Sequence, residues 1–336
     1  MRVKIKDVAE KAGVSIATVS LALNGNEKIN IETRRRVAEV AKALGYRPNP
    51  SAKRLASRRS RQIGLVVPDI ENLYYAALAQ HALNALQASD YALIISSSMN
   101  SRSMEQRIVS DMIGNQVDGL MIAPVEKPNG DISYLNALDD ADIPYVFVTA
   151  SYADLDHPCV MCDLYGGMRA LLDHLYEAGC RHIELLTGAQ GVRCLELRES
   201  AYLDFCAERG LGHRVIHRIS DICYEDSFRL AKAMPLDGTD AIVCVNDMAA
   251  LGAINALKAR GLRVPENIAV AGFDDNIFSR VSPVSITTVR QDVGRMAANA
   301  AAWMLDRLQK REPDPELLRL IPCQVMPRQS TDRRGI

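Results

Sequence analysis

Residues 5–25 read IKDVAEKAGVSIATVSLALNG, and this stretch predicts a helix-turn-helix. Lys6–Ala12 has the apolar spacing of a short helix, and Gly13 supplies the tight turn that the motif needs. Ser15 is a suitable cap for a second helix. Residues three and four apart share a helix face, so the inward face holds Val19, Ala22 and Leu23. The outward face holds Ile16, Ala17, Ser20 and Leu21.

A third helix completes a small all-α head that we place at residues 1–46. It is predicted to begin near Asn30, a good capping residue, and to end at Gly45. Its apolar stripe has the spacing i, i+3, i+4, i+7 of an amphipathic helix and consists of Val37, Val40, Ala41 and Leu44.

The charge of the chain is divided unevenly. Residues 1–61 carry a net charge of +10, whereas the remaining residues carry −11, although the whole chain is almost neutral. A basic head on an acidic body is typical of a protein whose head binds nucleic acid. No apolar run approaches the roughly 18 residues of a membrane span, and the start MRVKIKDVAE lacks a signal core, so we expect a cytoplasmic protein.

The head resembles the start of the lactose-repressor (LacI/GalR) family of bacterial transcription regulators. The resemblance lies in IKDVAEKAGVSIATVSLALNG and in ETRRRVAEVAKALGYRPN, without gaps. It implies that the second helix enters the major groove of DNA and that Ile16, Ala17 and Leu21 meet the bases. Many members have Arg where this chain has Leu21. Apolar side chains contact thymine methyl groups, so we expect A·T-rich half-sites. The alternative is that Ile16 or Leu21 is buried against the third helix.

Residues 47–61 are predicted to be a hinge. The run RPNPSAKRLASRRSRQ holds two prolines and a short helix-capable stretch that would order only on a partner. By the resemblance it is a hinge helix in the minor groove, with Leu55 as an apolar wedge and Ala52 and Lys53 beside it. A plain basic linker is the alternative. The candidate DNA-binding residues are Ser15, Ile16, Ala17, Thr18, Ser20, Leu21, Asn24, Ala52, Lys53 and Leu55.

Residues 62–336 predict an α/β core of two doubly wound parallel-sheet lobes. Apolar runs such as IGLVVPD, GLMIA and AIVCVN are typical of buried parallel strands, and helical segments alternate with them. The core resembles the periplasmic-binding-protein type I-like effector core of the same family, through VNDMAALGAINAL, VAGFDD and ITTVRQD. We place lobe 1 at about 62–160 plus 292–322, and lobe 2 at about 161–291 plus 323–336.

Polar side chains follow several of the predicted strands, where ligands of such folds bind. The resemblance implies effector contacts for some of them, whereas capping of the next helix is an equally good explanation for any one. The candidates are Asp69, Tyr74, Tyr75, Asp163, Arg198, Asn246, Asp274 and Gln291. Carboxylate, amide and guanidinium groups suit sugar hydroxyls, so the expected effector is a sugar. Thr149, Ala123 and Cys194 stand where sugar-responsive members often have polar residues, which makes the first-lobe side less polar.

The resemblance implies a repressor that binds a near-palindromic operator as a dimer. No leucine heptad follows the core, so a leucine-zipper tetramer is not expected. Control by a partner protein, or dependence on a corepressor, are the alternatives. The dominant catalytic motifs are absent, so an enzyme is not expected. Cys159 and Cys162 lack further ligands that would complete a zinc site, and we expect neither a metal nor a cofactor.

Overall fold

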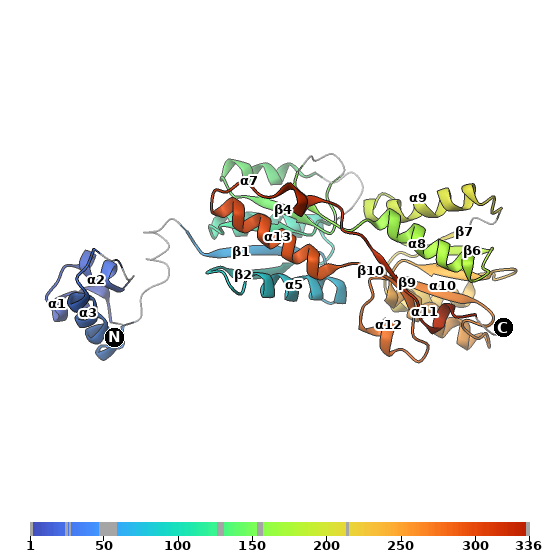
Figure 1. The fold of residues 1–336 in the computed structure, drawn as a ribbon, viewed down its shortest axis with the longest axis horizontal. Coiled ribbons are helices and arrows are strands. Elements are labelled where there is room, and N and C mark those ends of the chain that lie inside the picture. Colours follow the sequence, from blue (N-terminus) through green and yellow to red (C-terminus); the bar gives the residue numbers. More distant parts are fainter. Residues whose placement is uncertain are drawn as a thin grey trace. The chain divides into compact units, whose positions relative to one another are not determined.

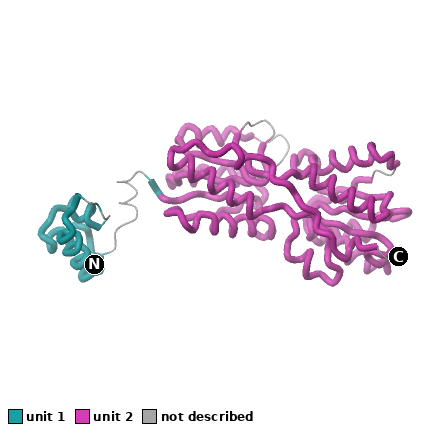
Figure 2. The backbone as a smooth tube through the Cα atoms, viewed as in Figure 1, with its two compact units in different colours: residues 1–60 teal, residues 61–336 magenta. Residues whose placement is uncertain are grey.

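The computed structural model describes residues 3–23, 26, 28–46, 59–125, 131–152, 157–212 and 215–333. The chain divides into two compact units, residues 1–60 and residues 61–336, which Figure 2 colours separately. No helix among the described residues is long and apolar enough to cross a membrane.

The first unit is a three-helix head. Its helices are α1 (Ile5–Ala12), α2 (Ile16–Leu23) and α3 (Ile31–Ala43). Gly13 ends α1 with a φ of 67°, and its backbone N–H caps carbonyls of that helix, a conformation that glycine adopts without strain. Asn30 caps α3 by accepting a hydrogen bond from the Glu32 backbone N–H at 2.8 Å. The helices meet in a small core centred on three fully buried valines, Val8, Val19 and Val37.

The second unit contains two parallel-sheet lobes (Figure 1). The first sheet has the strand order β2-β1-β3-β4-β5, and every pairing in it is parallel. Its strands are β1 (Gln62–Val67), β2 (Ala92–Ser97), β3 (Gly119–Ile122), β4 (Tyr145–Val148) and β5 (Cys159–Val160). The connecting helices are α5 (Leu73–Leu86), α6 (Arg102–Gly114), η1 (Ser133–Leu135) and α7 (Asn136–Asp140).

The second sheet has the order β11-β10-β9-β8-β6-β7, in which only the β10–β11 pair is antiparallel. Its strands are β6 (Ile183–Thr187), β7 (Val215–Arg218), β8 (Ala241–Cys244), β9 (Ala269–Phe273), β10 (Thr287–Arg290) and β11 (Gln324–Met326). Its helices are α8 (Leu164–Glu177), α9 (Arg193–Glu208), α10 (Tyr224–Ala233), α11 (Asp247–Ala259) and α12 (Ile277–Val281). In Figure 1, α8 and α9 lie on one face of this sheet and α10 and α11 on the other.

Three segments of the chain connect the lobes. The first leads from β5 to α8, and the second leads from β10 to α13 (Val293–Leu308), which packs on α5 and β4 of the first lobe. The third leaves η2 (Pro315–Leu318) and reaches β11, ending in η3 (Gln329–Thr331); it is the dark-red segment of Figure 1. Cys162 of the first segment pairs with Ile321 of the third in a parallel bridge. The carboxyl ends of both sheets therefore face one another across these connections.

We expect the Gly252→Ala variant to lose about 1–3 kcal/mol of unfolding free energy because its methyl group would overpack the α10–α11 contact. A Cβ at Gly252 would lie 2.5 Å from the backbone oxygen of Tyr224 and 3.1 Å from the backbone nitrogen of Phe228. The control is Gly114→Ala at the end of α6, where a Cβ would meet nothing within 4 Å. That change should be neutral or stabilising. Urea denaturation measures both; equal stability of the two variants would contradict the expectation.

Candidate functional site

The outward face of α2 is exposed and largely apolar. Ile16 is 48% exposed and Leu21 is 40% exposed, and Ala17 between them is also exposed. Val19 and Ala22, on the opposite face, are buried in the head core. The alternative in which Ile16 or Leu21 is buried against the third helix therefore does not describe this head.

The polar candidates of α2 have local partners. The Ser15 Oγ accepts a hydrogen bond from the Thr18 backbone N–H at 3.0 Å, and the two hydroxyls lie 2.8 Å apart. Ser15 therefore caps α2, while Ser20 is half-buried beside the exposed apolar side chains. The remaining DNA-binding candidates, Asn24, Ala52, Lys53 and Leu55, lie outside the described residues.

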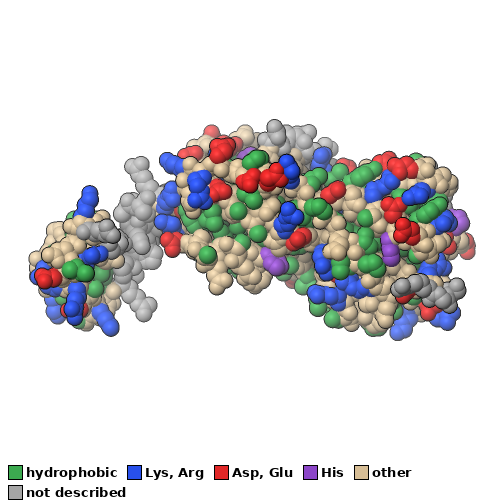
Figure 3. All heavy atoms as spheres, viewed as in Figure 1, with side chains coloured by type: hydrophobic (Ala, Val, Ile, Leu, Met, Phe, Trp, Pro, Cys, Tyr) green, Lys and Arg blue, Asp and Glu red, His purple; other side chains and the backbone are tan. Residues whose placement is uncertain are grey.

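Basic side chains are numerous on the surface of the head. Figure 3 shows Lys and Arg as the prevailing charged side chains on the visible face of this unit. Arg34, Arg35 and Arg36 lie in the first turns of α3, near the positive end of the helix dipole. Arg35 forms an ion pair with Glu39 one turn further along α3, at 3.1 Å, and both side chains are exposed. Such a surface is suited to a phosphate backbone.

A cleft of about 600 Å³ lies between the lobes, at the carboxyl ends of their strands. Seven of the eight effector candidates line it: Asp69, Tyr74, Tyr75, Arg198, Asn246, Asp274 and Gln291. The eighth, Asp163, is not among the lining residues. Its carboxylate instead caps α8 by accepting a hydrogen bond from the Gly166 backbone N–H at 2.8 Å.

A hydrogen-bonded chain crosses the cleft floor from lobe to lobe. The Tyr74 hydroxyl, on α5 of the first lobe, donates to Gln291 Oε1 at 3.0 Å. The Gln291 Nε2 donates to Asp274 Oδ1, which follows β9 of the second lobe, at 2.8 Å. Burial raises the pKa of the Asp274 carboxyl, and the Arg198 guanidinium opposes that rise. Burial and then Asp274 raise the pKa of the Tyr74 hydroxyl. A ligand that enters the cleft meets these polar groups already oriented.

Arg198 is held rigidly at the second-lobe side of the cleft. Its Nε donates to the Cys194 carbonyl at 3.0 Å, and its Nη1 donates to the Val245 carbonyl at 2.8 Å. The guanidinium lies over the Phe273 ring, 4.6 Å from the centroid. Nη2 donates to the Cys194 Sγ at 3.8 Å. The residue is only 8% exposed, and each terminal nitrogen keeps one further N–H for a ligand acceptor. A fixed guanidinium of this kind binds oxygen atoms with defined geometry.

Asn246 both caps a helix and lines the cleft, whereas Asp163 caps a helix and does not line the cleft. The Asn246 Oδ1 accepts a hydrogen bond from the Ala249 backbone N–H at 2.8 Å, which caps α11, and its side chain also lines the cleft. Asp69 likewise closes a local turn through the Glu71 backbone N–H at 2.9 Å while lining the cleft. A capping interpretation therefore does not by itself exclude a place in the cleft.

One part of the first-lobe wall is mainly apolar and is braced from behind by a buried carboxylate. This part follows β3 and β4 and contains Pro124, Val125, Thr149 and Ala150. The fully buried Glu105 accepts a hydrogen bond from the Val125 backbone N–H at 2.7 Å and others from the hydroxyls of Tyr134 and Tyr152. Thr149 has a φ of 74°, a conformation that β-branched residues rarely adopt, and such strain is concentrated at functional sites.

Several cleft residues were not among the sequence candidates. Asn72 and Asn100 belong to the first lobe, and the segment after β7 contributes Ser220, Asp221, Ile222 and Cys223. The β7 segment could have been found from its position directly after a strand. The same criterion identified the candidates that follow the other strands. Val192, Cys194 and Leu195 line the cleft from the start of α9 in the second lobe, so Cys194 does not belong to the first-lobe side as expected.

The described residues contain no group of three or more His, Cys, Asp or Glu side chains that could hold a metal ion. All eight cysteines lie in the described part of the chain, and none forms a disulfide.

Comparisons with known proteins relate both units to one kind of protein. The sequence model for bacterial regulatory proteins of the lacI family matches residues 4–49, and that for a periplasmic binding protein-like domain matches residues 172–331. The HTH-type transcriptional regulator pepR1 of Lactobacillus delbrueckii subsp. lactis is 30% identical over 331 residues, covering 98% of each chain. Catabolite control protein A of Priestia megaterium is 29% identical over 337 residues, covering 98% of this chain and 100% of that protein.

Two solved structures extend the likeness to the fold. The lac repressor dimer bound to operator and the anti-inducer ONPF superposes with a TM-score of 0.86 at 24% identity, covering 98% of this chain and 99% of that chain. The complex of the transcriptional regulator CelR with cellobiose gives a TM-score of 0.71 at 27% identity, covering 98% of this chain and 100% of that chain.

Proposed function

Because this chain belongs to the lacI family of bacterial regulatory proteins and is a DNA-binding transcriptional regulator, we propose that it is a repressor controlled by a sugar in its cleft. In this proposal a dimer binds a near-palindromic operator, with one α2 helix in the major groove of each half-site. The sugar alters the arrangement of the two lobes and thereby the affinity for DNA.

The observation that carries the effector part of the proposal is the polar chain Tyr74–Gln291–Asp274 across the cleft, with Arg198 beside it. Carboxylate, amide and guanidinium groups pair with hydroxyls, and a buried site built for hydrogen bonds discriminates strongly against ligands that lack them. Because this series of hydrogen bonds joins both lobes, a ligand that replaces one of the hydrogen bonds acts on both lobes at once. The lac repressor bound to ONPF and CelR bound to cellobiose add support by analogy.

The DNA part of the proposal rests on the exposed face of α2. Ile16, Ala17 and Leu21 can contact thymine methyl groups but offer no side-chain hydrogen bonds to guanine. In-vitro selection of random duplex DNA with the full-length chain tests this. We expect palindromes with A·T pairs where α2 docks. Guanine-rich half-sites would mean that other residues read the groove, and no enrichment would mean that the unliganded protein does not bind an operator.

A sugar panel tests the effector part. Thermal unfolding of the full-length chain is followed with D-glucose, D-galactose, D-xylose, lactose and cellobiose, and the sugar with the largest stabilisation is called the panel sugar below. A ligand at 100 times its Kd stabilises by about 2.7 kcal/mol, which is readily detected. The sign of its effect on operator binding then separates an inducer from a corepressor. If the whole panel fails while the operator is bound, control by a partner protein becomes the better proposal.

The proposed dimer has a suitable apolar surface in the first lobe. Leu73 and Leu83 on α5 are 36% and 40% exposed, and Ile95 on the edge strand β2 is 37% exposed. Among the described residues no strand pairs with the outer edge of β2. Exposed apolar groups beside an edge strand are typical of association surfaces.

We expect Leu83→Arg to convert the dimer largely to monomer, because the guanidinium would be buried without a partner in the interface. Sedimentation velocity at micromolar concentration measures the change. The control is Leu203→Arg on α9, where the leucine is 37% exposed and lies outside the proposed surface. A monomeric wild type, or dissociation of both variants alike, would contradict the assignment.

A further inference from the structure

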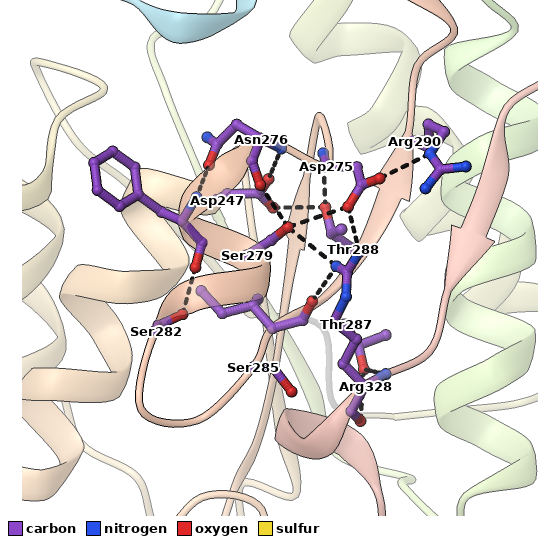
Figure 4. Close-up of polar contacts among 12 residues, drawn as sticks. Asp247, Asp275, Asn276, Ser279, Ser282, Ser285, Thr287, Thr288, Arg290 and Arg328 are labelled. Atoms are coloured by element: carbon purple, nitrogen blue, oxygen red, sulfur yellow. Dashed lines mark hydrogen bonds and ion pairs between the residues drawn. The ribbon is translucent and has the colours of Figure 1, made fainter.

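Asp275 is next in sequence to the cleft residue Asp274 but does not line the cleft itself. Its side chain is 5% exposed. Figure 4 shows its carboxylate at the centre of a polar cluster. One oxygen accepts from Arg290 Nε at 2.7 Å, while the other accepts from the Ser279 hydroxyl at 3.1 Å and pairs with Arg328.

The turn that carries Asp274 and Asp275 has an unfavourable backbone. Asp274 has a φ of 101° and Asp275 a φ of 54°, so two consecutive non-glycine residues lie in the left-handed half of conformational space. Such a turn persists only where the surroundings over-determine it. The strain lies at the position from which Asp274 reaches Gln291.

Backbone hydrogen bonds hold the turn against β10 and the start of α11. The Asp274 N–H donates to the Val289 carbonyl at 2.8 Å, and the Asn276 N–H donates to Asp247 Oδ2 at 2.7 Å. Asp247 is fully buried and also accepts a hydrogen bond from the Thr288 hydroxyl at 2.5 Å. These bonds fix the two ends of the turn. The Asp275 N–H, which donates to the Thr288 hydroxyl at 3.3 Å, and the Asp275 carboxylate hold its middle.

The two cations that hold Asp275 come from segments that connect the lobes. Arg290 is the last residue of β10 and immediately precedes Gln291. Arg328 follows β11, and its Nη1 also donates to the Ile286 carbonyl at 2.8 Å and to the Ser279 hydroxyl at 3.0 Å. Burial alone would raise the pKa of Asp275, but Arg328 and then Arg290 lower it below its ordinary value. The carboxylate is therefore held in its charged form.

We propose, on the basis of the proposed function, that Asp275 is a positioning residue for the effector site. It acts through Asp274: the Arg290–Asp275–Arg328 cluster holds the strained turn so that the Asp274 carboxylate meets Gln291 and the effector. The same cluster ties this turn to the second and third connections between the lobes. A ligand that contacts Asp274 therefore also acts, through this cluster, on the second and third connections between the lobes.

Hydrogen–deuterium exchange of the full-length chain tests the positioning role without any ligand. In Asp275→Asn, we expect exchange about tenfold faster in peptides covering residues 272–279 and 287–291, and unchanged in α8 and α9. The control is Asp306→Asn, which removes the Asp306–Arg311 ion pair of the first lobe. It should leave both segments unchanged. Unchanged exchange in Asp275→Asn, or acceleration spread evenly over the second lobe, would overturn the proposal.

A double variant separates positioning from general stability. Asp275→Asn leaves Arg328 largely buried without its carboxylate, and Asp275→Asn combined with Arg328→Met removes that uncompensated charge. We expect the double variant to recover melting temperature but to keep the fast exchange of residues 272–279. Recovery of both together would overturn the proposal.

Arg290→Gln tests the same turn if Asp275→Asn fails to fold, because the Arg290 side chain is 43% exposed and tolerates replacement. It should accelerate exchange in residues 272–279 by a smaller factor, and unchanged exchange there would overturn the proposal. The Kd of the panel sugar should rise at least tenfold in Asp275→Asn and stay unchanged in Asp306→Asn. Because the exchange results need no sugar, a failure of the proposed effector class is distinguishable from a failure of this inference.

Discussion

Replacement of Arg198 by alanine is expected to raise the Kd of the panel sugar at least 100-fold. The variant loses the guanidinium that lines the cleft, and it leaves the buried Asp274 without its neighbouring cation. Hydrogen bonds involving charged groups contribute about 1.5–3 kcal/mol each, and a factor of ten in Kd corresponds to about 1.4 kcal/mol. Isothermal titration calorimetry with the full-length chain measures the effect.

Two further variants show whether the guanidinium itself is responsible. Arg198→Lys keeps the charge but replaces the fixed fork by a flexible ammonium, so an intermediate loss is expected. Arg193→Ala removes an exposed arginine from the same helix, outside the cleft, and should bind like the wild type. An Arg198→Ala Kd within about threefold of the wild-type value would mean that the sugar binds elsewhere.

Replacement of Ile16 by glutamate is expected to weaken operator binding at least 100-fold. Ile16 is 48% exposed and is the first residue of α2. In the proposed complex the new carboxylate would be buried among DNA bases and phosphates without a cation. The head itself should stay folded, because an acidic residue in the first turn of a helix is favourable.

Fluorescence anisotropy with the selected operator measures this loss. Gln309→Glu is the control: it changes the net charge equally at an exposed position after α13, outside the head. It should leave the operator affinity within about twofold of the wild type. If Ile16→Glu binds with wild-type affinity, the outward face of α2 does not enter the groove.

The fold class follows from sequence patterns because those patterns reflect burial. In the head, the outward and inward faces of α2 are predicted by the helical period, and the buried Val19 and the exposed Leu21 agree with it. In the core, continuous apolar runs predict parallel strands, and the two sheets confirm the predicted class of two parallel-sheet lobes. Membership of the lacI family, expected from the resemblance, is confirmed by the comparisons.

The candidate site was less predictable because a polar residue after a strand has two uses. Asp163 and Asn246 occupy the same kind of position, yet Asp163 only caps its helix whereas Asn246 also lines the cleft. The direction in which a carboxylate or amide side chain points depends on loop geometry. The periodicity of apolar residues in the sequence does not predict that geometry. The Thr149 φ of 74° is another property of the folded loop with no sequence signal. The DNA-binding and effector roles of all these residues remain proposals.

The central claim is that the cleft and the DNA-binding head are coupled, and operator titrations with and without the panel sugar test it most directly. Allosteric coupling typically amounts to about 1–3 kcal/mol, a factor of about 5–150 in affinity. We predict that the panel sugar changes the Kd for the selected operator by at least fivefold, and that saturating operator changes the Kd for the sugar by the same factor. An operator Kd that stays constant while calorimetry shows the cleft to be saturated would contradict the account.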